Sequence, residues 1–303
     1  MKSLSPRFLA TLGILLASAL WGASFVTQKI AGTHMGSFTY NGVRFLLGAL
    51  SLCPVIFALE RKTSPATIRH TWLAGMGGGI LIFIAANLQQ LGIVLSRSPS
   101  SASEAGFITG LYTVFVPILG LALGRKTRPL VWVSAVLAFV GLTLISVGPG
   151  GLSSVQASDL LLVLCAVVWA VHILYIDRFV RTVSPVRFTA AKFTVSGTLS
   201  VLCAFIFEDV SVQGLIDGAM PLLYGGIVAS GIAYTLQVLG QRRVAPSRAA
   251  IIFSMEALFA ALSEAIFLGI TMTLQKTIGG AVIFTGILLS QRQGKQSPRQ
   301  DDA

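Results

Sequence analysis

Long apolar runs follow one another along almost the whole chain, separated by short stretches of Pro, Gly, Ser and charged residues. Apolar positions within each run are continuous instead of alternating, which is typical of membrane-spanning helices of about 20 residues and not of porin-like strands. We therefore predict an all-α integral membrane protein with ten spans. They lie near residues 8–28, 38–59, 71–95, 101–123, 130–147, 158–177, 186–207, 219–239, 248–269 and 274–290.

The composition leaves no room for a soluble domain. Of the 303 residues, 54% are apolar and 11% are charged, with a mean hydropathy of +0.82, whereas soluble domains carry about 25% charged residues. Ten spans use about 200 residues, and the remainder is needed for loops and tails. Cys53, Cys165 and Cys203 lie inside apolar runs without CxxC spacing, so we interpret them as packing residues with no disulfide or metal role.

The net charge of +11 is distributed unequally along the chain. With the N-terminus inside, 17 of the 22 Lys and Arg residues fall on the cytoplasmic side and 3 on the opposite side. Short loops rich in Lys and Arg stay cytoplasmic. This pattern predicts cytoplasmic N- and C-termini, and it explains the positive charge without a nucleic-acid partner.

The two halves of the sequence resemble each other when one is shifted by 148 residues. The informative matches are Trp21 with Trp169, Arg44 with Lys192, Glu60 with Glu208 and Gln89 with Gln237. A unit with an odd number of spans must insert its second copy upside down, which gives an inverted repeat. We predict a first five-helix repeat at 1–150, a second, inverted repeat at 151–291 and a polar cytoplasmic tail at 292–303. The last two spans of each half lose the register, which indicates an insertion or deletion near 100–110.

Charged side chains inside the spans are costly and call for an explanation. Glu256 lies near the midplane of the ninth span and is too short to reach an interface, so it either faces a cavity or forms a buried pair, for example with Lys192. Glu264, two turns further, either continues a polar path or packs at the periphery. Arg44 and Lys192 each lie about 10 Å from one end of a span, where they could reach the interface or act as gates or counter-charges.

Aromatic and amide side chains add further candidates. Trp21 and Trp169 lie deeper than an interfacial belt and would form cavity walls or core packing. His172 shares a helix face with Trp169 and could bind substrate, relay protons or make a helix–helix hydrogen bond. Gln89 near the outer end of the third span and Gln237 near the inner end of the eighth suit gates, although interhelical hydrogen bonds are the ordinary alternative. Asn87, Tyr112 and Tyr234 are weaker candidates.

Catalytic signatures are absent from the sequence: there is no HExxH, GxSxG, Walker-type phosphate loop or Cys/His metal cluster. We therefore expect neither an enzyme nor a cofactor-binding protein. Inverted repeats commonly support alternating access around a central site. Because the chain has no nucleotide-binding loop, transport would be downhill or coupled to an ion gradient, with protons as a candidate ion.

Several segments resemble one known family. They are 19–25 (ALWGASF), 43–47 (VRFLL), 89–92 (QQLG), 105–112 (AGFITGLY), 169–172 (WAVH) and 249–256 (AAIIFSME). In this order, the sequence resembles EamA-type transporters of the drug/metabolite transporter superfamily from about residue 8 to 290. It departs from the family at Arg125, where glutamate often follows Gly124, and at Ala257, where proline often follows Glu256.

The resemblance implies a ten-helix inverted-repeat bundle in the bacterial inner membrane, with a cavity lined by spans 1, 3, 4, 6, 8 and 9. The expected cavity residues are Trp21, Asn87, Tyr112, Trp169, His172, Tyr234 and Glu256. The leading expectation is a secondary transporter that exports small metabolites, first of all amino acids. The alternatives are a transporter or flippase of amphipathic drug-like or lipid-linked substrates, and a channel or sensor.

Overall fold

The computed structural model describes residues 5–98, 100–125, 127–146, 156–271 and 273–291, and within these ranges the chain forms helices and no strands. The first half contains α1 (Pro6–Ala31), α2 (Ser37–Leu59), α3 (Pro65–Leu95), α4 (Ser101–Thr109), α5 (Tyr112–Ala122) and α6 (Pro129–Ser146). The second half contains α7 (Ala157–Phe179), α8 (Pro185–Phe207), α9 (Val212–Asp217), α10 (Ala219–Leu223), the π-helix η1 (Tyr224–Ile232), α11 (Ala233–Gln241), α12 (Pro246–Phe253), α13 (Glu256–Leu268) and α14 (Leu274–Gln291). The all-α prediction is confirmed.

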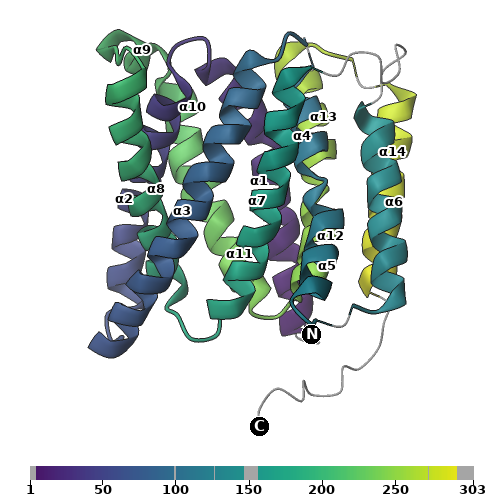
Figure 1. The fold of residues 1–303 in the computed structure, drawn as a ribbon, viewed down its shortest axis with the longest axis horizontal. Helices are drawn as coiled ribbons and strands as arrows, with labels where there is room; N and C mark the ends of the chain where they lie inside the picture. The colour runs from purple at the N-terminus through teal and green to yellow at the C-terminus, as the bar shows by residue number, and fades with distance from the viewer. Residues whose placement is uncertain (1–4, 99, 126, 147–155, 272, 292–303) are drawn as a thin grey trace.

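The helices stand side by side in one upright bundle, with α2 and α8 at one end of the long axis and α6 and α14 at the other (Figure 1). Eight helical stretches are long and apolar enough to cross a membrane, and α6 and α14 contribute two shorter apolar helices. Together they correspond to the ten predicted spans, because α4 with α5, α10 with η1 and α11, and α12 with α13 each form one interrupted span. The tail predicted at 292–303 lies outside the described residues.

Burial in this bundle is reversed relative to a soluble protein. Phe57 and Ile206 are 72% and 71% exposed, whereas Arg44, Lys192 and Glu256 are buried. Apolar side chains on the outside suit hydrocarbon, while ionisable groups inside a membrane protein face the protein interior. The outer surface is therefore the one that meets lipid.

The pairing of α2 with α8 shows the inverted repeat at the level of hydrogen bonds. At one end, the Glu208 carboxylate at the end of α8 accepts hydrogen bonds of 2.8 Å from the Phe38 and Thr39 amides in the first turn of α2. At the opposite end, the Glu60 carboxylate just after α2 accepts hydrogen bonds of 3.0 Å from the Val186 and Arg187 amides in the first turn of α8. Glu60 and Glu208 are 148 residues apart, so the two halves cap each other reciprocally.

These caps predict a measurable stability effect. Glu208→Ala removes three acceptor contacts, to the Phe38 amide, the Thr39 amide and the Thr39 hydroxyl, and is expected to lower the free energy of unfolding by about 1–2 kcal/mol. Thermal unfolding in detergent micelles measures this change. Asp217→Ala is the matched control, because that carboxylate accepts one exposed hydrogen bond from Gln213; equal effects of the two substitutions would contradict the capping role.

Two of the spans are interrupted at equivalent positions. α4 gives way to α5 at Gly110–Leu111, and α12 gives way to α13 at Ser254–Met255. The two breaks are 144 residues apart, so the register of the repeat changes by four residues between the third and fourth spans. This change explains why the last two spans of each half do not follow the shift of 148.

Candidate functional site

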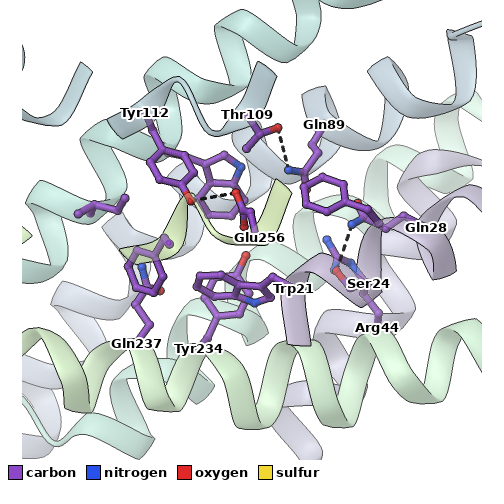
Figure 2. Close-up of a pocket in the computed structure, with 14 residues that line it drawn as sticks. Trp21, Ser24, Gln28, Arg44, Gln89, Thr109, Tyr112, Tyr234, Gln237 and Glu256 are labelled. Atoms are coloured by element: carbon purple, nitrogen blue, oxygen red, sulfur yellow. Dashed lines mark hydrogen bonds between the residues drawn. The ribbon is translucent and has the colours of Figure 1, made fainter. Parts of the chain in front are cut away.

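A central cavity lies between the two halves. Helices α1, α2, α3, α4, α5, α7, α11, α12 and α13 contribute to its wall (Figure 2). The wall residues are Trp21, Ser24, Phe25, Gln28, Arg44, Gln89, Thr109, Tyr112, Trp169, Ile173, Tyr234, Gln237, Phe253 and Glu256. Eight of the predicted site residues are therefore brought together around one space.

Glu256 and Tyr112 face each other at the two helix breaks. The Tyr112 hydroxyl donates a hydrogen bond of 2.9 Å to Glu256 Oε1 (Figure 2). Each residue begins the second segment of its span, at positions related by the shift of 144. Among the described residues, Glu256 has no Lys or Arg within ion-pair distance. The wall thus holds a carboxylate near mid-membrane with one neutral hydrogen-bond donor.

The break beside Glu256 is supported by neighbouring hydroxyl groups. Ser18 Oγ donates to the Phe253 carbonyl at 3.0 Å, and Thr113 Oγ1 donates to the Ala250 carbonyl at 3.1 Å. A helix that is interrupted in the membrane must satisfy its freed carbonyl groups internally. Ser18 provides such a donor for the Phe253 carbonyl, whereas the Ala250 carbonyl also accepts a backbone hydrogen bond of 3.1 Å from the Ser254 amide.

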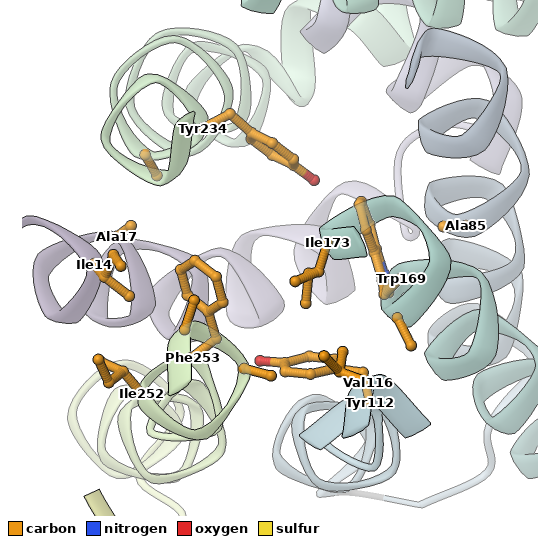
Figure 3. Packing of buried hydrophobic residues seen from close by; sticks show 14 of the residues in the cluster. Ile14, Ala17, Ala85, Tyr112, Val116, Trp169, Ile173, Tyr234, Ile252 and Phe253 are labelled. Carbon is orange, nitrogen blue, oxygen red and sulfur yellow. The ribbon is translucent and has the colours of Figure 1, made fainter. Parts of the chain in front are cut away.

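Aromatic rings form the apolar part of the wall. Trp21 lies against Tyr234 and Phe253, with ring centroids 4.7 and 5.2 Å apart, and Trp169 lies 6.0 Å from Tyr234. The Trp21 indole N–H donates to the Ala229 carbonyl at 2.9 Å, in the π-helix η1, whose altered hydrogen-bonding pattern leaves backbone groups for side chains. Figure 3 shows the Tyr112, Trp169 and Tyr234 rings projecting toward one common space.

Arg44 supplies the positive charge of the cavity wall. It is 3% exposed, so the interpretation that it reaches the membrane interface is wrong. Its Nε donates to Asn41 Oδ1 at 2.8 Å, and its guanidinium carbon lies 5.1 and 4.4 Å from the Tyr40 and Phe45 ring centroids. Asn87 was expected on the wall but lies behind it, where its Oδ1 accepts from the Asn41 amide at 2.9 Å. It acts as a positioning residue, because it orients the amide that holds Arg44.

His172 and Lys192 also lie behind the wall. Both are fully buried, so the expected position of His172 on the cavity surface and the interfacial interpretation of Lys192 are both wrong. The alternative Glu256–Lys192 pair is absent from the ion pairs of the described residues. His172 does share its helix face with Trp169, as predicted, with ring centroids 5.3 Å apart.

The remaining candidates divide between the wall and the periphery. Gln89 and Gln237 both line the cavity, and Gln89 Nε2 donates to Thr109 Oγ1 at 3.2 Å. Glu264 lies away from the wall, and its Oε1 accepts from the Ala102 amide in the first turn of α4 at 3.2 Å. Glu264 is fully buried and does not line the cavity.

Six wall residues were not predicted from the sequence. Ser24, Phe25 and Gln28 follow Trp21 at intervals of three, four and seven residues, the spacing of one helix face. The same rule connects Ile173 to Trp169. Helical periodicity around the two tryptophans could therefore have identified four of the six residues. Thr109 and Phe253 could be identified only from the positions of the breaks in their spans.

An all-helical bundle with lipid-facing apolar sides and a polar and aromatic central cavity is the architecture of helical membrane transport proteins. The EamA-like transporter family matches residues 8–147 and 156–291, and the chain belongs to this family. It is therefore a multi-pass membrane transporter of small molecules.

Relatives cover nearly the whole chain. An uncharacterized transporter of Archaeoglobus fulgidus is 28% identical over 286 residues, which is 93% of this chain and 86% of that protein. The uncharacterized inner membrane transporter YicL of Salmonella typhimurium is 24% identical over 300 residues, 95% of this chain and 97% of that protein. A solved crystal structure with 21% identity has a TM-score of 0.77 and covers 94% of this chain and 97% of its own, so the fold is shared.

Proposed function

We propose that this transporter is an exporter of amino acids in the inner membrane, working by alternating access of its two halves around the central cavity. The observation that carries the proposal is the presence of Glu256 and Arg44 on one cavity wall without an ion pair from either to any described residue. An α-amino acid carries an ammonium and a carboxylate group. The ammonium would pair with Glu256, and the carboxylate would pair with Arg44.

The surrounding groups suit such a zwitterion. An ammonium beside Glu256 would also lie among Trp21, Tyr112 and Tyr234, whose ring faces attract cations. The Arg44 guanidinium offers paired N–H donors of the kind that recognise carboxylates. Substrate recognition by charge at both ends would leave the apolar rings to contact the amino-acid side chain.

Alternating access would use the inverted halves, which contribute the equivalent interrupted spans α4–α5 and α12–α13 to the site. Rocking of one half against the other would expose the same site to opposite sides in turn. Protonation of Glu256 would couple the cycle to a proton gradient, because a neutral Glu256 no longer attracts the substrate ammonium. Cytoplasmic N- and C-termini and export as the transport direction are both part of this proposal.

A second candidate substrate class follows from the aromatic wall. Trp21, Phe25, Trp169, Tyr234 and Phe253 line one cavity, and such surfaces also bind amphipathic, drug-like or lipid-linked molecules. Binding of such a substrate would depend more on the aromatic rings than on the charges of Glu256 and Arg44.

Counterflow in proteoliposomes tests the proposal. Vesicles loaded with unlabelled amino acids are expected to accumulate radiolabelled amino acid in a saturable manner, and an imposed proton gradient should change the rate. The decarboxylated amines are the matched control probes and should exchange about tenfold or more slowly, because they leave Arg44 without its partner. Equal exchange of amines and amino acids, or none above empty liposomes, would refute the amino-acid proposal and favour the amphipathic class.

A further inference from the structure

A buried cluster of nitrogen atoms lies behind the cavity wall and has no role in the site described so far. Lys192 Nζ and both ring nitrogens of His172 are fully buried, and none has a hydrogen-bond partner among the described residues. A buried donor without an acceptor is costly, and a buried lysine more so. The cluster is therefore a place where an anionic group would be stabilised.

The surroundings of Lys192 repeat those of Arg44. Phe188 lies 5.0 Å from Lys192 Nζ, and Tyr40, its counterpart 148 residues earlier, lies 5.1 Å from the Arg44 guanidinium carbon. The stem of Lys192 crosses Gly78, where an added Cβ would lie 2.8 Å from Lys192 Cδ. The stem of Arg44 crosses Gly225, where the same distance to Arg44 Cδ is 3.3 Å. Each half thus provides a glycine against which the cation of the other half lies, Gly78 for Lys192 and Gly225 for Arg44, and we call each such arrangement a cradle.

The two cradles differ in what separates them from the cavity. Arg44 lines the wall, whereas Lys192 is covered by Tyr234, whose ring centroid lies 5.5 Å from Nζ. The position equivalent to Tyr234 in the first half is Ala86, which is too small to cover Arg44. His172 also packs against the Tyr234 ring, at 6.3 Å between centroids, while its counterpart Ser24 is on the wall.

We propose that Lys192, with His172 beside it, forms a second, occluded binding position for the anionic group of the substrate, closed by the Tyr234 ring. Arg44 holds a carboxylate when the first-half cradle is open, as in this structure. In the conformation that opens to the other side of the membrane, the two cradles exchange their environments. Tyr234 moves aside, and Lys192 then faces the cavity. The carboxylate then passes between Lys192 and Arg44 during the cycle. This inference rests on the proposed function for the identity of the anionic substrate.

Thiol labelling tests the occluded position without any substrate. In a chain whose three cysteines are replaced, Ser24→Cys and His172→Cys provide matched reporters, because they are equivalent positions on the open and the closed side. The probes are an anionic and a cationic methanethiosulfonate. We expect Ser24→Cys to react about tenfold or more faster than His172→Cys. Adding Tyr234→Ala should raise the rate at His172→Cys by a similar factor, since it removes the cover.

The opened site should also select by charge. In the His172→Cys, Tyr234→Ala chain, the anionic reagent is expected to react faster than the cationic one, and Lys192→Met should abolish that preference. Tyr234→Phe keeps the ring and should leave His172→Cys protected, which separates loss of the cover from general loosening. Each variant is used only when it remains monodisperse in size-exclusion chromatography.

Three results would overturn the inference: an already reactive His172→Cys, no gain with Tyr234→Ala, or no Lys192-dependent preference for the anion. Counterflow is an independent test. Lys192→Arg should retain amino-acid exchange, and Lys192→Met should lower its rate by about tenfold or more. Exchange at the unsubstituted rate by Lys192→Met would also overturn it. If the unsubstituted chain exchanges no amino acid but the labelling pattern holds, the proposed function has failed and the anion site stands.

Discussion

Glu256→Gln is expected to lower amino-acid counterflow by about 10- to 100-fold. The glutamine keeps the size of the side chain and can still accept the hydrogen bond from Tyr112, which measures 2.9 Å, but it cannot balance a substrate ammonium. A hydrogen bond to a charged group contributes about 1.5–3 kcal/mol, which corresponds to that range of binding. The measurement is the initial rate of counterflow per folded transporter.

Tyr112→Phe is the matched control for this prediction. It removes the neutral partner of Glu256 and leaves the carboxylate, so we expect a smaller loss, up to about tenfold. The response to an imposed proton gradient should survive Tyr112→Phe and disappear in Glu256→Gln. Counterflow and gradient response that are both unchanged in Glu256→Gln would remove Glu256 from the site.

The positions of the spans could be predicted from hydropathy because lipid imposes one requirement on every spanning helix, a continuous apolar run. The inverted repeat was visible in residues that are rare in such runs. Trp21 and Trp169 illustrate this: the match was visible in the sequence, and the structure places both rings on the cavity wall. The equivalence of Glu60 and Glu208 was visible in the sequence. Their hydrogen bonds to the first turns of α2 and α8 were not.

The direction in which a side chain points could not be read in the same way. Asn87 and Gln89 are two residues apart on α3, yet Gln89 reaches the cavity whereas Asn87 donates to Ser200 Oγ on α8 at 3.0 Å. The partner is 113 residues away along the chain. Only the packing of the two helices decides which amide faces the cavity, and hydropathy carries no information on that packing.

Lys192 shows the same limit of sequence reasoning for a charge. Its distance from the span end allowed an interfacial position, but the glycine at position 78 lets the lysine stem turn inward beneath Tyr234. The break at Ser254–Met255 has neither Pro nor Gly to announce it. It becomes readable only when the segments 105–112 and 249–256 are aligned with the shift of 144, which pairs it with Gly110–Leu111.

Gly22→Ala is expected to destabilise the fold by about 1–3 kcal/mol, the usual range for overpacking. α1 and α13 are in close contact here: an added Cβ would lie 2.7 Å from the Glu256 carbonyl oxygen and 2.9 Å from the Ala260 amide nitrogen. Both are backbone atoms, so no side-chain rotation relieves the clash and the two helices must separate. Thermal unfolding in detergent measures the effect.

Gly13→Ala on the same helix is the control that isolates close approach from helix propensity. An added Cβ there meets only Leu236 Cδ2, at 3.7 Å, and alanine is favoured over glycine in a helix by about 1 kcal/mol. We therefore expect Gly13→Ala to be neutral or stabilising. Because Gly22 packs on the residue that carries the cavity carboxylate, Gly22→Ala should also reduce counterflow per folded molecule, whereas Gly13→Ala should not. Similar unfolding temperatures and similar counterflow for the two variants would show that the α1–α13 contact neither limits stability nor positions Glu256.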